Sequence, residues 1–202
     1  MAVGKLIVFE GIDGSGKTTV HNILKEMLSD YGCFVFSREP TDGVYGRKVK
    51  EMLREGCRCG EELFYTILKD RAEHVDNLIN PALECGKIVV LDRYFISNMV
   101  YQGRSSFDLN YILVINRMIA PEPDLVVYFD VTVGEALKRL MANRKEFSVF
   151  ETGEELMRVR GNYESVLGLF NTYRVDAMKN VEEVIDEVKS MLLGVKGDRD
   201  GE

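Results

Sequence analysis

A run of eight residues near the start of the chain has the glycines and side chains needed to bind phosphate. It follows the pattern G-x-x-x-x-G-K-[ST] and consists of Gly11, Ile12, Asp13, Gly14, Ser15, Gly16, Lys17 and Thr18. The glycines let backbone N–H groups converge on phosphate oxygens, and a helix that begins after them adds partial positive charge. We expect Lys17 to reach the β- and γ-phosphates of a nucleotide and Thr18 to bind Mg²⁺, with Thr19 beside them.

Further side chains suited to phosphate or metal follow two other apolar segments. Asp92 ends the segment 88–92, and an Asp in this position binds the Mg²⁺ of P-loop enzymes, usually through water. Arg93 comes next and Arg38 ends another apolar segment, and the planar guanidinium group suits a second phosphate. Because no water-activating Glu follows Asp92, the sequence argues against an ATP hydrolase. It favours two phosphorylated ligands that meet head to head.

Planar polar side chains repeat at helical spacing directly after this position. Tyr94, Asn98 and Tyr101 stand at i, i+4 and i+7 and therefore share one face of a helix. Ile67 and Arg71 share a face of the preceding helix, where Arg71 could donate to a base carbonyl. The pattern predicts a pocket for a flat polar base, and core packing is the alternative for the apolar members.

A basic segment, 138–145, precedes the irregular segment 146–153. It contains Arg139 and Arg144. A basic helix end that leads into a short loop is typical of a lid that closes over phosphates and excludes water. A solvated helix face with cations at its C-terminus explains the pattern equally well.

These residues must be positioned by alternating short apolar segments and longer amphipathic ones, which predict an α/β fold with a parallel sheet between helices. We expect a three-layer P-loop fold with five strands, at 4–10, 33–38, 88–92, 125–130 and 172–176. Helices are expected at 17–31, 43–55, 60–85, 94–103, 109–120, 133–143, 153–169 and 180–193. The chain is predicted to form a single domain, 1–195, with a lid at about 144–153 and a disordered tail at 196–202.

Size and charge exclude several classes of protein. A chain of 202 residues suits one α/β domain, and its net charge of −7 argues against a general nucleic-acid or anionic-membrane binder. No stretch of about 18 apolar residues occurs, so we expect no membrane span. The first strand begins at once and leaves no room for a signal peptide, and we expect a cytoplasmic protein.

Taken together, these motifs resemble the thymidylate kinase family of P-loop nucleoside monophosphate kinases. The similarity spans nearly the whole chain and rests on Phe9–Thr18, Arg38–Pro40, Asp70–His74, Asp92–Tyr94, Ser97–Asn98 and Tyr101–Gly103. The resemblance implies transfer of the γ-phosphoryl group of ATP to dTMP with Mg²⁺, which gives dTDP and ADP and serves dTTP synthesis. It also implies a homodimer.

The resemblance assigns roles to individual residues. Asp13 would contact the sugar 3′-hydroxyl or a metal-bound water, and Arg38 and Arg93 would hold the acceptor phosphate. Arg71 would donate to a thymine carbonyl, and Asn98 would pair with the base ring nitrogen. The other residues expected at the substrate are Tyr101, which would crowd the sugar 2′ position, and Pro40, Ile67 and Ser97.

The chain departs from the family at three places. Some members carry an Arg within the loop, where this chain has Gly14, so the transition-state cation is expected from Arg139 or Arg144, beside Lys17 and Arg93. The family usually has a Phe that stacks on thymine where this chain has Ile67, which removes roughly 0.5–1.5 kcal/mol of aromatic contact. The lid run also differs, at 148–151.

Three alternatives remain beside dTMP phosphorylation. A broader deoxypyrimidine monophosphate kinase would also accept dUMP. A deoxynucleoside kinase would use a carboxylate such as Glu39 to deprotonate a 5′-hydroxyl. A catalytically weak nucleotide-binding regulator would keep the fold with a degraded lid. A GTP-dependent switch is disfavoured because the sequence has no N-K-x-D motif.

Overall fold

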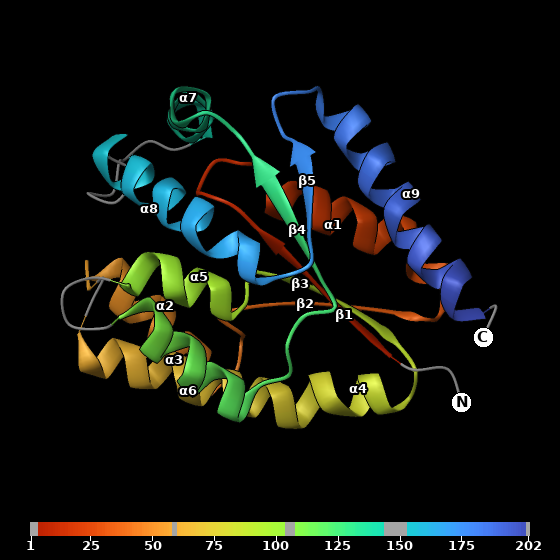
Figure 1. The fold of residues 1–202 in the computed structure, drawn as a ribbon, viewed down its shortest axis with the longest axis horizontal. Helices are drawn as coiled ribbons and strands as arrows, with labels where there is room; N and C mark the ends of the chain where they lie inside the picture. Colours follow the sequence, from red (N-terminus) through yellow and green to blue (C-terminus); the bar gives the residue numbers. More distant parts are fainter. Residues whose placement is uncertain (1–3, 58–59, 104–107, 144–152, 201–202) are drawn as a thin grey trace.

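The computed structural model describes residues 4–57, 60–103, 108–143 and 153–200. Its centre is a five-stranded sheet in which every strand pair is parallel, in the order β2-β3-β1-β4-β5 (Figure 1). The strands are β1 (Lys5–Glu10), β2 (Phe34–Arg38), β3 (Ile88–Asp92), β4 (Leu125–Asp130) and β5 (Thr172–Asp176). The predicted α/β class and the five-stranded parallel sheet are confirmed.

The three central strands are almost entirely buried, which explains their continuous apolar sequences. Strands β2 and β5 lie at the edges and are partly exposed. In the register, Phe9 of β1 and Arg38 of β2 both pair with Asp92 of β3. The carboxyl ends of these strands therefore lie level at one edge of the sheet, where ligands bind in such folds.

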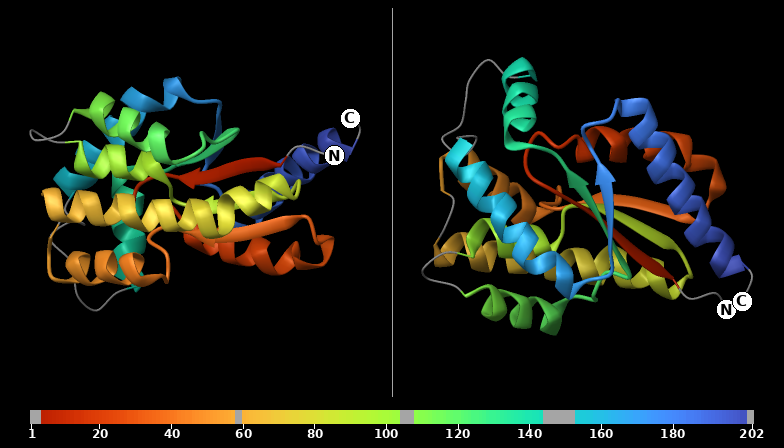
Figure 2. Two further views of the ribbon diagram at one scale, coloured as in Figure 1. Left: turned by 90° about the horizontal axis from the view of Figure 1, so that it is seen from below. Right: turned by 45° about the horizontal axis from the view of Figure 1, so that its top comes forward.

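Helices cover both faces of the sheet. Helix α1 (Lys17–Met27) and helix α9 (Val181–Asp200) lie side by side on one face, as the views in Figures 1 and 2 agree. The remaining helices gather mostly on the other side and around the carboxyl edge: α2 (Val44–Arg54), α3 (Glu61–His74), α4 (Asn80–Glu84), α5 (Phe95–Gln102), α6 (Leu109–Ile119), α7 (Val133–Asn143) and α8 (Gly153–Val166).

Three of the expected helices contain or end in segments of another helical type. The helix expected at 60–85 contains a π-helical segment, η2 (Val75–Ile79), between α3 and α4. The helix expected at 153–169 is α8 followed by the short 3₁₀ segment η4 (Leu167–Leu169), and another such segment, η1 (Ser29–Tyr31), follows α1. Within the described residues, no helix has the length and apolarity to cross a membrane.

The last helix is longer than expected. Helix α9 continues to Asp200 rather than ending at 193, so it includes most of the segment expected as a tail. It passes through Gly194 and Gly197, and each glycine costs a helix only about 1 kcal/mol relative to alanine. Packing of its buried residues against the core offsets that cost, since Val188 and Leu192 are fully buried.

Candidate active site

The glycine-rich loop connects the end of β1 to the start of α1, as its motif requires. Gly11, Gly14 and Gly16 all have positive φ, at 149°, 80° and 92°. At these values a β-carbon would be strained, so the loop depends on glycine. A β-carbon at Gly14 would also lie 2.5 Å from the carbonyl oxygen of Ala136 in α7. The loop and α7 are therefore in direct backbone contact.

Lys17 is held inside this loop. Its Nζ donates to the carbonyl oxygens of Gly11 and Ile12 at 2.8 and 2.9 Å and to Oγ of Ser15 at 3.1 Å. Only 4% of Lys17 is exposed, and burial, followed by repulsion from Arg93, lowers its pKa to about 8. The ammonium group is thus poised to exchange loop oxygens for phosphate oxygens.

The pair predicted to bind Mg²⁺ is assembled. Oγ1 of Thr18 donates to Oδ2 of Asp92 at 2.6 Å. Oδ1 of Asp92 is buried and has no hydrogen-bond partner among the described residues. An unsatisfied buried carboxylate oxygen beside a hydroxyl fits a hard cation that keeps several waters. In the described part of the chain no cluster of three or more metal-ligating side chains occurs.

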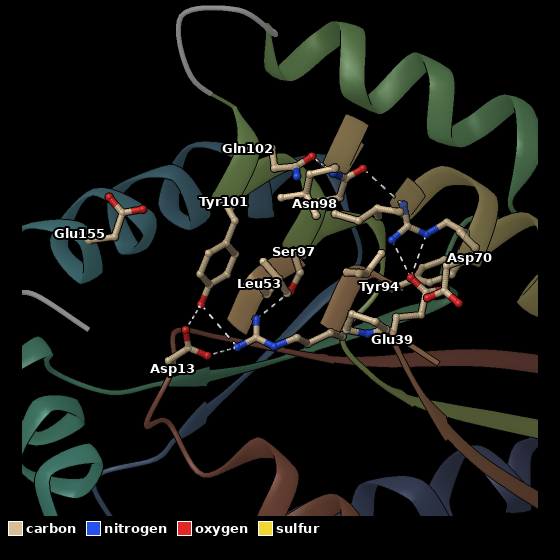
Figure 3. A pocket seen from close by; sticks show the side chains of 16 residues that line it. Asp13, Glu39, Leu53, Asp70, Tyr94, Ser97, Asn98, Tyr101, Gln102 and Glu155 are labelled. Atoms are coloured by element: carbon tan, nitrogen blue, oxygen red, sulfur yellow. Dashed lines mark hydrogen bonds and ion pairs between the residues drawn. The ribbon is translucent and has the colours of Figure 1, made fainter. Parts of the chain in front are cut away.

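Arg93 joins the loop to helix α5. Its guanidinium group forms an ion pair with Asp13 and donates to Oγ of Ser97 at 2.9 Å and to the hydroxyl of Tyr101 at 3.4 Å. That hydroxyl donates in turn to Asp13 at 3.1 Å (Figure 3). The φ of Arg93 is 71°, a left-handed value that is uncommon outside glycine. The contacts of the guanidinium group place it at the boundary between the loop and the adjacent pocket.

Arg71 forms a buried ion pair with Glu39. Only 1% of Arg71 is exposed, and its Nε and Nη2 atoms donate to Oε2 of Glu39 at 2.9 and 2.6 Å. Burial alone would raise the pKa of Glu39, but Arg71 and a hydrogen bond from His74 together hold it below its ordinary value. The two hydrogen bonds to Glu39 thus fix the orientation of the Arg71 guanidinium group.

A pocket of about 210 Å³ lies between these two arginines (Figure 3). Its walls come from the β2–α2 loop, α2, α3, the β3–α5 connection and α5, with one residue each from the glycine-rich loop and α8. The site residues predicted from the sequence that line it are Asp13, Pro40, Ile67, Arg71, Arg93, Ser97, Asn98 and Tyr101. Arg71 with Asn98 and Arg93 with Asp13 form two polar groups in its lining, and the apolar residues that line it include Ile67, Leu53 and Val49. The pocket can hold a flat polar ring with a charged group towards Arg93.

Arg38 does not line this pocket, and its assignment to the acceptor phosphate stays a prediction. It ends β2 and pairs in register with Asp92, the residue before Arg93, so it lies at the same carboxyl edge of the sheet. It lines a second pocket of about 420 Å³ with Lys25 and His21, and its guanidinium group has no hydrogen bond or ion pair with the described residues.

Of the two arginines expected near the lid, the structure describes Arg139 but not Arg144. Arg139 pairs with Glu135 at 3.0 Å and donates to the carbonyl oxygen of Ala177 at 2.8 Å. A methyl group placed on Gly16 would lie 4.0 Å from Nη1 of Arg139, so this residue lies over the glycine-rich loop. Arg144 and most of the expected lid, 144–152, lie outside the described residues.

Sequence reasoning missed several buried polar residues that support the site. Glu10 accepts hydrogen bonds from the backbone N–H groups of Tyr94 and Ser97 at 3.0 and 3.1 Å and from the hydroxyl of Tyr163 at 2.7 Å. Burial raises the pKa of Glu10. It ties β1 to the start of α5, and a charged residue at the end of an otherwise apolar strand was the available signal.

Two other residues were missed because only the tertiary fold reveals their contacts. Asp70 accepts from the backbone N–H and the hydroxyl of Thr41 at 2.9 and 2.5 Å, which fixes the loop after β2. Asn116 of α6 is fully buried against Arg71 and Asn98. Asp70 begins the segment Asp70–His74 that carries the family resemblance, but that segment does not reveal its contact with Thr41. Asn116 stands at no position that a motif or a periodicity marks.

Comparison with known proteins agrees with this geometry. The family model described as thymidylate kinase matches residues 9–188. A probable thymidylate kinase of Pyrococcus abyssi is 40% identical over 205 residues, which cover 95% of this chain and 99% of that protein. A thymidylate kinase of Akkermansia muciniphila is 43% identical over 190 residues, which cover 94% of this chain and 91% of that protein. One of Xanthomonas campestris pv. campestris is 36% identical over 197 residues, which cover 97% of this chain and 86% of that protein. With the loop, the metal pair and the adjoining pocket in place, the chain belongs to the thymidylate kinase family.

Proposed function

We propose that this protein transfers the γ-phosphoryl group of ATP to the 5′-phosphate of dTMP, producing dTDP and ADP. The observation that supports it most directly is the position of Arg93, which lies between the glycine-rich loop and the pocket for a flat base and contacts residues of both. Two phosphorylated ligands bound on either side would meet at this guanidinium group.

On the donor side, the loop residues Gly11–Thr18 and Thr19 would surround the triphosphate of ATP. Lys17 would leave the loop oxygens for the β- and γ-phosphates. Thr18 and Asp92 would hold Mg²⁺, which supplies charge neutralisation between the phosphates when bound.

On the acceptor side, Arg93 would bind the 5′-phosphate of dTMP, and Asp13 and Tyr101 would contact the deoxyribose. Arg71 and Asn98 would bind the polar edge of thymine. Pro40 and Ser97 would line the pocket, and Ile67 would cover the ring. Arg38, which ends β2 in register with Asp92, is proposed as a second residue that holds the acceptor phosphate.

The acceptor oxygen is already ionised at neutral pH, so transfer needs little general-base catalysis. Positioning and charge stabilisation by Lys17 and Arg93 would supply most of the rate enhancement. Arg139, which lies over the loop, is the described candidate for an additional cation on the transferring group. Arg144 is a second candidate from the sequence.

A deoxynucleoside kinase is the less favoured reaction. Its catalytic base would be Glu39, but both carboxylate oxygens of Glu39 are engaged, by Arg71 and by His74. A broader deoxypyrimidine monophosphate kinase stays open, because the aliphatic Ile67 contributes no ring stacking that would depend on the base.

The test is a coupled ADP-release assay with ATP and Mg²⁺ across dTMP, dUMP, dCMP, CMP, UMP, AMP, GMP and thymidine. We expect the highest kcat/KM with dTMP. Turnover of thymidine without dTMP would move the assignment to a nucleoside kinase. If ATP binds but no acceptor is phosphorylated, the result would favour a nucleotide-binding regulator.

We also propose a homodimer and a cytoplasmic location. Helix α6 exposes Tyr111, Val114 and Met118 on one face, with Met118 79% exposed, and Tyr65 of α3 is exposed beside them. An apolar face of this kind on a two-helix surface suits a subunit contact. ATP and deoxynucleotides are cytoplasmic metabolites, which supports the location.

A further inference from the structure

At the Arg71 end of the pocket, side chains form a chain of hydrogen bonds. The groups at its two ends determine which atoms of the chain donate and which accept. One end is Arg71, whose guanidinium group can only donate hydrogen bonds. Its Nη1 donates to the side-chain oxygen of Asn116. The other anchor is the backbone carbonyl of Ile112, which can only accept, and Nδ2 of Asn116 lies 2.7 Å from it. The Asn116 amide is therefore fixed in one orientation.

The fixed amide in turn fixes its neighbour. Nδ2 of Asn116 also donates to Oδ1 of Asn98 at 3.1 Å. If the Asn98 amide were turned over, two NH₂ groups would face each other in a fully buried position, at the cost of an unsatisfied donor. Nδ2 of Asn98 therefore points the other way and donates to Oε1 of Gln102 at 2.7 Å. Gln102 can adopt either orientation, so it cannot set the direction.

The result is a wall with a donor beside an acceptor. Nη1 of Arg71 and Oδ1 of Asn98 lie 3.4 Å apart, the longest contact in this chain of hydrogen bonds, and both residues line the pocket. A base edge that replaces this weak contact must offer an acceptor to Arg71 and a donor to Asn98. A carbonyl beside a ring N–H has that order, as in thymine and uracil. Cytosine has an amino group beside an unprotonated ring nitrogen, the reverse order.

We infer that Asn116 is a positioning residue for base selection: by fixing the direction of the Asn98 amide, it makes the pocket select a 4-oxo pyrimidine over a 4-amino pyrimidine. This inference rests on the proposed function. Asn116 is fully buried on α6 and does not line the pocket, so it acts through Asn98 and Arg71. The 5-methyl group plays no part, so dTMP and dUMP share this selection.

The decisive variant is Asn116→Asp, which keeps the shape and the acceptor for Arg71 but removes the donor for Asn98 and for the backbone carbonyl of Ile112. The Asn98 amide should then turn to donate to the new carboxylate, which places its NH₂ group beside Arg71. Thymine N3–H would face a donor, whereas the unprotonated N3 of cytosine would face a partner. The measurement is kcat and KM for dTMP, dUMP and dCMP at saturating ATP.

In the unaltered enzyme we expect kcat/KM for dTMP and dUMP to exceed that for dCMP by about a hundredfold, since two mispaired groups cost about tenfold each. In Asn116→Asp we expect this ratio to fall by at least about tenfold, mainly through KM of the 4-oxo substrates. An equal loss on all three nucleotides would overturn the inference, because a merely structural role lowers them together.

Two further variants keep the test sharp. Asn116→Leu adds no charge, and it tests the inference if Asn116→Asp fails to fold. It should lower the same kcat/KM ratio by a smaller factor, because the Asn98 amide can then adopt either orientation. Asn110→Asp adds the same charge at an exposed position of the same helix and should leave the ratio unchanged. A shift in Asn110→Asp as large as in Asn116→Asp would overturn the inference in favour of a charge effect.

The inference and the proposed function fail differently. If the unaltered enzyme turns over none of the monophosphates, the proposed function is wrong and the inference falls with it. If it turns over dTMP but the ratio is the same in both Asn116 variants, only the inference is wrong.

Discussion

The hydroxyl of Thr18 and the carboxylate of Asp92 are 2.6 Å apart although 74 positions separate them in the sequence. The start of α1 and the end of β3 thus present two oxygen ligands side by side, with Oδ1 of Asp92 left without a partner among the described residues. The contact exists because β1 and β3 are neighbours in register, with Phe9 paired to Asp92. It turns two separate motifs into one candidate magnesium site.

Removal of the Asp92 charge should weaken the use of Mg²⁺. We expect Asp92→Asn to raise the Mg²⁺ concentration for half-maximal activity by about 10–100-fold. Binding of ATP without Mg²⁺ should not weaken, because the variant removes a negative charge near the phosphates. Asp130→Asn, at the end of β4 on the same sheet edge, is the matched control. An unchanged Mg²⁺ dependence in Asp92→Asn would contradict the assignment.

Binding of ATP should depend on the protonation of Lys17. Burial and then Arg93 lower the pKa of Lys17 to about 8 in the free protein, and the bound phosphates should raise it again. Only the protonated form attracts phosphate, so affinity should fall as pH rises above about 8, by up to about tenfold per pH unit. Calorimetry at pH 8.5 in two buffers of different ionisation enthalpy should show proton uptake, and Lys17→Met should abolish it.

Arg93 can be removed without a backbone penalty. Its φ of 71° suits glycine, so Arg93→Gly relieves backbone strain while it removes the side-chain contacts, and it should stay as stable as the unaltered protein. Arg93→Ala removes the same contacts but keeps the strained φ, so it should lose roughly 1 kcal/mol in free energy of unfolding. Both variants should weaken dTMP binding by more than about tenfold and affect ATP less. Titration of each nucleotide separately measures this, and equal losses for both would count against an acceptor-phosphate role.

The buried pair of Glu39 and Arg71 should be costly to break. Glu39→Gln leaves the Arg71 charge uncompensated, so we expect a loss of about 3–5 kcal/mol in free energy of unfolding. Glu73→Gln, two residues after Arg71 on α3 and only partly buried, serves as the control and should cost far less. Denaturant unfolding with both variants measures the difference.

The same pair predicts a dependence of stability on pH. The pKa of Glu39 lies below its ordinary value of 4.5, because Arg71 and His74 outweigh the opposing effect of burial. Its contribution to stability is therefore complete above pH 4.5 and is lost as pH falls through the lower pKa of the folded state. We expect the unaltered protein to lose more stability than Glu39→Gln between pH 6 and pH 3. Parallel curves for the two proteins would refute this.

The apolar face of α6 offers a test of the subunit contact. Val114→Glu places a charge in the middle of the exposed row formed with Tyr111 and Met118. If this face joins two subunits, the variant should be monomeric in sedimentation while its melting temperature changes little. Lys138→Glu, at an exposed position on α7, should leave the oligomeric state unchanged.

Most of the fold could be predicted because local pattern determines it. Strands β1, β3 and β4 are buried on both faces and therefore appear as unbroken apolar segments. The left-handed glycines, such as Gly32 and Gly86, end the helical segments where they were expected to. The length of α9 was missed because packing decides whether a helix continues through weakly disfavoured residues.

The site was predicted only where one segment supplies it. The loop from Gly11 to Thr18 could be recognised directly because its neighbours in sequence are its neighbours in space. The pocket that Arg38 lines could not be predicted, because the end of a strand can be recognised in the sequence but the position of that strand in the sheet cannot. Asn116 could not be found because 45 positions separate it from Arg71, and a lone Asn in an apolar helix gives no pattern.

The close approach of Gly14 to Ala136 limits how this enzyme can change. Relatives that carry an arginine in the loop and this chain, which has Gly14, cannot be interconverted here by one substitution, since even a β-carbon would collide with the backbone of α7. An evolutionary route, or a design, would have to displace α7 first and add the arginine second. If Arg139 or Arg144 supplies the transition-state cation, as we propose, epistasis between the glycine-rich loop and α7 would keep that cation outside the loop.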